Sequence, residues 1–133
     1  MADDVRTTRT VLSQVPVPLI RAGAWFCIVL LGVLSWLPAS LEKRTGLPGP
    51  IEHLFAYFCT AVVLMLAYPR SSRLKLMGGL IGYAALLEAG QLYVPGRTAQ
   101  TFDWAASALG AMLGMVAITC FSRSPRAPAI ADE

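Results

Sequence analysis

Four side chains able to bind ligands or move protons lie close together in an otherwise apolar chain. Glu88, Gln91, Arg97 and Asp103 all fall within the segment LLEAGQLYVPGRTAQTFDW, residues 86–104. A planar guanidinium can hold carboxylates through paired hydrogen bonds, and an amide both donates and accepts. Residues three positions apart share a helix face, so Glu88 and Gln91 should point the same way. The set could recognise an anionic or hydroxyl-bearing ligand.

A second polar pair, Glu52 and His53, opens another apolar segment. His53 could act as a general base and Glu88 as an acid, if burial favours the protonated carboxyl group. The sequence contains no metal-ligand spacing, nucleophile elbow or phosphate-binding loop. We therefore expect no metal and no cofactor, and the sequence leans away from an enzyme. The isolated cysteines are interpreted as small hydrophobic residues; they are Cys27, Cys59 and Cys120.

Small residues at a spacing of four predict where helices pack closely. They are Gly78 and Gly82 in one apolar segment, and Gly110 and Gly114 in a later one. Glycine at this spacing lets two helix backbones approach each other in a membrane. The two segments are therefore expected to pack together. Ser107 follows Asp103 by four residues, so both side chains should lie on one face of the later helix.

The composition is that of a membrane protein. Apolar residues make up 56% of the 133 residues and charged residues 14%, whereas a soluble domain has about a quarter charged. A small soluble domain exposes a large share of its residues, and this chain has too few polar residues to cover such a surface. The net charge of +3 comes from residues that flank apolar stretches, which indicates membrane topology and no nucleic-acid partner.

The elements that must position the polar residues are four apolar helices. A bilayer core of about 30 Å needs roughly 20 helical residues. Four segments qualify, giving an all-α, polytopic membrane protein; they are residues 22–41, 51–68, 74–93 and 102–121. They form one domain, residues 19–121, between tails at residues 1–18 and 122–133. The first segment is too long for a signal-peptide core, so we expect it to be retained.

Basic residues predict the orientation of these helices, because lysine and arginine are enriched on the cytoplasmic side. Eight lie on the side of both termini, against three on the other side, which are Lys43, Arg44 and Arg97. Both termini should therefore be cytoplasmic. The two polar groups then meet at the opposite membrane face, drawn from three helices and one loop.

Each polar residue also has a structural interpretation. Glu52 and Asp103 fall in the first turn of a helix, where the helix dipole favours a negative charge. His53 could be a hydrogen-bonded surface residue, and Arg97 a topology signal. Glu88 lies roughly 7 Å inside the end of its helix, where an unpaired charge is costly. We expect Arg97 to pair with it.

The motifs resemble those of the VanZ-like membrane proteins of bacteria. They are EHLFAY at residues 52–57, E-x-x-Q at 88–91, VPGR at 94–97, and Asp103 followed by a glycine-rich helix. The resemblance covers residues 49–114. It departs from the family at Gly49 and Pro50, where an Asp-Lys pair is common, and at Ser107, where Asn is usual.

This resemblance implies a small multi-pass protein of the bacterial inner membrane. The founding family member is associated with low-level teicoplanin resistance, and relatives occur near genes for cell-envelope and exopolysaccharide synthesis. The family has no established reaction.

Three functions follow as hypotheses. The first is a non-catalytic envelope protein whose polar cluster binds a lipid-linked saccharide, an anionic headgroup or a partner protein. The cluster consists of Glu52, His53, Glu88, Gln91, Arg97, Asp103 and Ser107. The second is an intramembrane enzyme using His53 and Glu88 on such a lipid. The third, ranked last, is a proton-coupled transporter using Glu88 and Asp103. Expected partners are the bilayer and either an envelope protein or a second copy of the chain.

Overall fold

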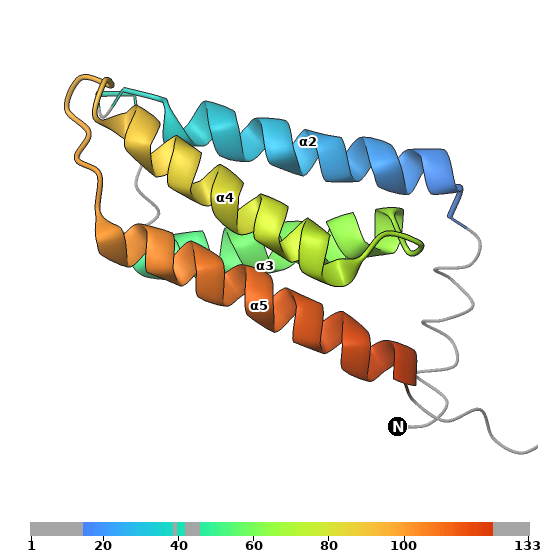
Figure 1. Ribbon diagram of the computed structural model, residues 1–133. Coiled ribbons are helices and arrows are strands. Elements are labelled where there is room, and N and C mark those ends of the chain that lie inside the picture. The colour runs from blue at the N-terminus through green and yellow to red at the C-terminus, as the bar shows by residue number, and fades with distance from the viewer. Residues whose placement is uncertain (1–14, 39, 42–45, 124–133) are drawn as a thin grey trace, which may run out of the picture.

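The computed structural model describes residues 15–38, 40–41 and 46–123, and the described part of the chain forms four helices (Figure 1). They are α2 (Val17–Ser35), α3 (Gly49–Ala67), α4 (Arg73–Gln91) and α5 (Thr101–Arg123). The predicted all-α fold is confirmed. Residues 1–14 and 124–133 of the two predicted tails lie outside the described residues.

Three of the four helices are long and apolar enough to cross a membrane. They are α2, α3 and residues 101–122 of α5. Much of their apolar surface points outward, as at Trp25, Phe26 and Val29 of α2. Helix α4 has 19 residues, or about 28 Å at 1.5 Å per residue, but three charged residues reduce its hydropathy. A fourth crossing by α4 stays a prediction.

Prolines set the ends of α2, which is displaced toward the N-terminus from the predicted segment 22–41. The helix begins at Val17, with Pro18 in its first turn, where proline fits because the first N–H groups have no helical partner. It ends at Ser35. The carbonyl of Leu34 would need the N–H of residue 38 to continue the helix, and Pro38 has none.

Helices α3 and α5 form the most extensive contact of the fold. A Cβ atom added to Gly110 would collide with the backbone carbonyl of Leu54, and one added to Gly114 would lie 2.8 Å from the Cβ of Ala61. The pair Gly110 and Gly114 therefore permits close helix packing. Its partner is α3, however, and not the segment 74–93 as the sequence suggested.

The other glycine pair, Gly78 and Gly82, does not pack against another described helix, so the prediction for it was wrong. A Cβ atom added to Gly78 or Gly82 would meet no described atom within 4 Å. Helix α4 instead buries the face carrying Leu80, Ala84 and Leu87. Because these positions follow the helical repeat of three to four residues, the glycines at 78 and 82 fall on the opposite face.

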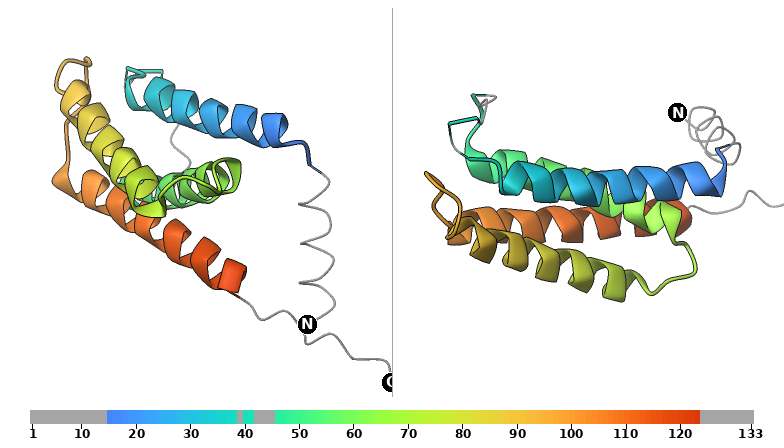
Figure 2. Two further views of the ribbon diagram at one scale, coloured as in Figure 1. Left: turned by 45° about the vertical axis from the view of Figure 1, so that its right-hand side comes forward. Right: turned by 90° about the horizontal axis from the view of Figure 1, so that it is seen from above.

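The four helices alternate in direction, so the bundle has two distinct ends (Figures 1 and 2). At one end of the bundle α2 and α4 end and α3 and α5 begin; we call it the cavity end, after the cavity described below. The basic end, opposite, carries Arg21, Arg70, Arg73 and Lys75. All acidic residues within the described part of the chain lie at the cavity end; they are Glu52, Glu88 and Asp103. The bundle thus separates its charges along its length.

Candidate ligand-binding site

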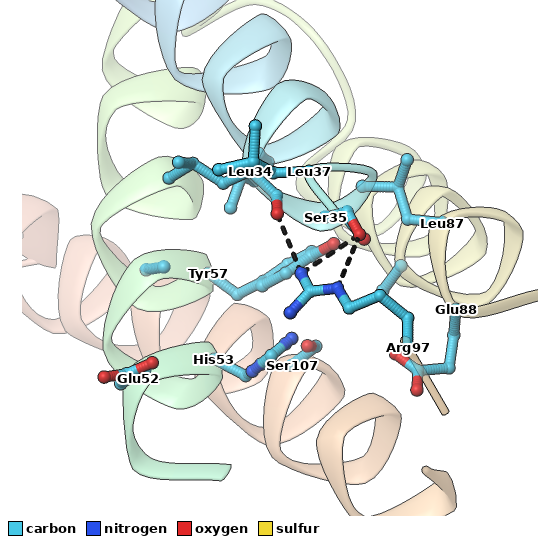
Figure 3. A pocket seen from close by; sticks show the side chains of 13 residues that line it. Leu34, Ser35, Leu37, Glu52, His53, Tyr57, Leu87, Glu88, Arg97 and Ser107 are labelled. Atoms are coloured by element: carbon cyan, nitrogen blue, oxygen red, sulfur yellow. Dashed lines mark hydrogen bonds between the residues drawn. The ribbon is translucent and has the colours of Figure 1, made fainter. Parts of the chain in front are cut away.

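A cavity of about 220 Å³ lies at the cavity end, between all four helices and the loop before α5 (Figure 3). This volume is far above the roughly 10–15 Å³ that one water molecule requires. The polar part of its lining consists of Ser35, Glu52, His53, Tyr57, Glu88, Arg97 and Ser107. The aliphatic part consists of Leu31, Leu34, Leu37, Ala56, Ala84 and Leu87.

Arg97 caps the end of α2. Its Nε donates to the carbonyl of Ser35 at 3.2 Å, and its Nη2 donates to the carbonyls of Leu34 at 2.8 Å and Ser35 at 3.0 Å (Figure 3). The last carbonyls of a helix lack intrahelical partners and carry partial negative charge. A guanidinium satisfies two of them together. The turn that presents Arg97 requires Gly96, whose φ is +77°.

Glu88 caps the start of α5. Its Oε1 accepts a hydrogen bond from the backbone N–H of Gln100, which immediately precedes the first residue of that helix. The first N–H groups of a helix need such an acceptor. Among the described residues, the hydrogen bonds of Glu88 and Arg97 go to two different helix ends, whereas the sequence had suggested that the two side chains pair with each other. Both side chains still line the same cavity.

Gln91 and Ser35 join α4 to α2 behind the cavity wall. The amide Nε2 of the buried Gln91 donates to Ser35 Oγ at 3.0 Å. Trp36 Nε1 donates to the carbonyl of Leu87 at 3.3 Å nearby. Gln91, a predicted binding residue, therefore serves as an interhelical contact and does not line the cavity. Ser35 was not among the predicted site residues, because its only signal in the sequence is a hydroxyl three residues before Pro38.

The ring of His53 is held in one orientation. Its Nδ1 lies 2.9 Å from the carbonyl oxygen of Gly49. A carbonyl oxygen only accepts hydrogen bonds, so Nδ1 carries the proton and Nε2 of the neutral ring has the lone pair. His53 and the buried Tyr57, one turn further along α3, both line the cavity. In the sequence, Tyr57 stands out only as the last residue of the EHLFAY motif.

Asp103 lies outside the cavity, between α5 and the first turn of α3. Its side chain is buried, and a Cβ atom built on Gly49 would lie 3.4 Å from Asp103 Oδ1. No described residue forms a hydrogen bond with this Oδ1. The positive end of the α3 dipole favours a carboxylate here. Ser107 Oγ donates to the backbone carbonyl of Asp103 at 2.8 Å and itself lines the cavity.

The seven predicted binding residues thus divide into two groups. Five line the cavity; they are Glu52, His53, Glu88, Arg97 and Ser107. Gln91 and Asp103 do not line it: Gln91 joins α4 to α2, and Asp103 is buried beside the first turn of α3. Within the described residues, no group of three or more His, Cys, Asp and Glu could hold a metal ion.

The polar side of the cavity carries several hydrogen-bond acceptors beside the donors of Arg97 and Tyr57. Glu52 and Glu88 carry carboxylates, His53 presents the lone pair of Nε2, and the hydroxyl proton of Ser107 is already donated to a carbonyl. Acceptors of this kind suit a ligand that supplies several N–H or O–H donors. The aliphatic side suits an apolar group attached to it.

No protein-family model, curated protein or solved structure matches this chain. The resemblance to VanZ-like proteins stays a prediction based on the sequence motifs.

Proposed function

We propose that the chain is a VanZ-like protein of the bacterial inner membrane that binds the headgroup of a lipid-linked saccharide without changing it. In this proposal all four helices cross the bilayer, both termini are cytoplasmic, and the cavity faces the periplasm. The single observation that carries the proposal is a cavity with acceptors on one side and aliphatic side chains on the other.

Sugar hydroxyls match the acceptors in type. Each hydroxyl can donate to a carboxylate oxygen of Glu52 or Glu88, or to Nε2 of His53, and hydrogen bonds to charged acceptors are the stronger kind. The positive charge of Arg97 at the same cavity favours the phosphate that links sugar to lipid. Leu34 and Leu37 offer an apolar surface where the lipid chain would begin.

The test is co-purification in a mild, uncharged detergent, followed by mass spectrometry of the retained lipids. Glu88→Gln keeps an oxygen that can accept from Gln100 N–H but removes the charge from the cavity. We expect it to retain at least tenfold less saccharide lipid than wild type, because a hydrogen bond to a charged group contributes about 1.5–3 kcal/mol. Arg73→Lys is the matched control. Arg73 ties α4 to Thr119 and Ser122 of α5 at the opposite end of the bundle, and its substitution should leave retention unchanged.

Two results would contradict the proposal. One is an identical set of lipids retained by wild type and Glu88→Gln. The other is retention of ordinary phospholipids alone in wild type, with no saccharide lipid detected in cells that make it.

One observation favours the enzymatic alternative as a second candidate. The hydrogen bond from His53 Nδ1 to Gly49 fixes the tautomer whose Nε2 can accept a proton in the cavity that Glu88 also lines. A general base needs this arrangement. Turnover of a lipid-linked saccharide by purified protein, lost in His53→Gln, would establish it. Binding without turnover in wild type would leave the non-catalytic proposal in place.

A further inference from the structure

A second hollow lies at the basic end, and the proposed headgroup site does not involve it. It is a groove of about 490 Å³ between α2, α3 and α4, within the range of about 300–1,000 Å³ found for small-molecule sites. Its walls are apolar and include Ile28 of α2, Leu64 of α3 and Leu80 of α4. Helix α2 contacts α4 little, which leaves the groove open between them.

The groove has a basic mouth. Lys75 lines it and is exposed. The guanidinium of Arg21 lies 5.3 Å from the centre of the Tyr68 ring, which also lines the groove. Trp25 Nε1 donates to the Tyr68 hydroxyl at 2.9 Å. Because every acid of the described chain lies at the other end of the bundle, nothing acidic in that part neutralises this mouth.

Gly79 of α4 forms part of the groove wall. A Cβ atom added there would meet no described atom within 4 Å. Glycines in membrane helices commonly mark a place where another group lies against the backbone. The described helices provide no such group at Gly79. Together with the basic mouth, this open apolar surface fits a molecule with an anionic head and a long hydrocarbon chain.

We propose that the groove binds one anionic phospholipid of the surrounding bilayer. The phosphate lies at Lys75, with the charge of Arg21 beside it, and one acyl chain runs along Gly79 between α2 and α4. Basic pockets between membrane helices recognise anionic headgroups in this way. Trp25 and Tyr68 suit the headgroup level, where amphipathic rings are enriched. This inference is independent of the ligand proposed for the cavity end.

Native mass spectrometry tests the proposal directly. The whole chain is purified in an uncharged detergent with equal amounts of dioleoylphosphatidylglycerol and dioleoylphosphatidylcholine, and the lipids that remain bound are counted. We expect wild type to retain one phosphatidylglycerol in preference to phosphatidylcholine. Lys75→Gln should weaken this retention about fivefold, the effect of one basic residue near an anionic lipid surface.

Matched controls separate the groove from general charge attraction. Arg70→Gln removes a positive charge from the same end, but Arg70 does not line the groove. Gly79→Leu should fill the groove and reduce retention, whereas Gly78→Leu adds the same side chain at the neighbouring position outside it. Both control variants should retain the lipid as wild type does.

Three outcomes would overturn the proposal. The first is equal retention of the two lipids by wild type. The second is an equal loss in Arg70→Gln and Lys75→Gln, which would indicate a diffuse charge effect. The third is a dimer in wild type that Gly79→Leu abolishes while lipid retention is unchanged, because the groove would then hold a second copy of the chain.

Discussion

At the scale of single residues, two charged side chains of this apolar protein form hydrogen bonds with backbone groups at the ends of helices. Arg97 donates to the last carbonyls of α2, and Glu88 accepts from the N–H that precedes α5. Inside a bilayer no water replaces such partners, and each unsatisfied backbone group costs several kcal/mol. Charged residues can therefore stabilise the fold here while the same side chains line a cavity.

Arg97→Lys should destabilise the protein. A lysine ammonium cannot reproduce the paired geometry of Nε and Nη2, so part of the capping of α2 is lost. We expect a loss of about 1–3 kcal/mol, measured as a lower midpoint of thermal unfolding in detergent. An unchanged midpoint would show that the bonds to Leu34 and Ser35 contribute little.

Substitutions of Glu88 separate its capping role from its charge. Glu88→Gln retains an acceptor for the N–H of Gln100, so its stability should fall by less than about 1 kcal/mol. Glu88→Ala removes the acceptor and should cost about 1–3 kcal/mol. The comparison uses the same unfolding assay. Equal stability of the two variants would contradict the capping role.

The polar residues of the apolar segments can be recognised from the sequence, but the atoms that they bind cannot. It paired Arg97 with Glu88 because opposite charges lie close in the sequence. Within the described part of the chain, the acceptors of Arg97 are the carbonyls of Leu34 and Ser35 in α2, and Pro38 leaves the first of these without a helical partner. A backbone atom has no signature in the sequence, and Leu34 and Ser35 are more than 60 positions away.

At the scale of helices, the contact between α3 and α5 depends on the absence of side chains. Gly110 lies against the carbonyl of Leu54 and Gly114 against Ala61. Hydropathy predicted that these segments are helices, and spacing predicted that glycines bring helices together. Neither could say which helix is the partner, because both α3 and α4 precede α5 and both touch it.

Gly110→Ala and Gly82→Ala should therefore change stability in opposite directions. At Gly110 the added methyl group meets a backbone carbonyl, and overpacking of this kind costs about 1–3 kcal/mol. At Gly82 the methyl group meets no described atom, and replacing glycine inside a helix gains about 0.5–1 kcal/mol. Thermal unfolding of the two variants tests this. A destabilised Gly82→Ala would show that its face is covered.

At the scale of the whole molecule, alternating helices place residues distant in sequence at one end. This convergence could be inferred from four apolar segments and the side on which lysine and arginine gather. The sequence could not show which of these residues line the cavity and which are buried beside it. Gln91 and Glu88 share a helix face, but Gln91 is buried and bonded to Ser35, whereas Glu88 lines the cavity.

Site-directed labelling tests whether α4 crosses the membrane. In a chain whose three cysteines are replaced, single cysteines are introduced at Ser71 and Thr98, in the exposed segments before and after α4. We expect an impermeant maleimide added to intact bacterial cells to label Thr98→Cys, and Ser71→Cys only after permeabilisation. Labelling of both positions from outside would exclude a crossing by α4 and the predicted topology.

The capping of α2 by Arg97 also constrains the order of assembly. A ribosome releases α2 long before residue 97, because 62 positions separate Ser35 from Arg97. The carbonyls of Leu34 and Ser35 lack this partner until that arginine is synthesised, and elongation proceeds at roughly 5–20 residues per second. The hydrogen bonds that cap α2 therefore form only after the segment between α4 and α5 has been synthesised. A chain truncated before residue 97 would lack the guanidinium that caps α2.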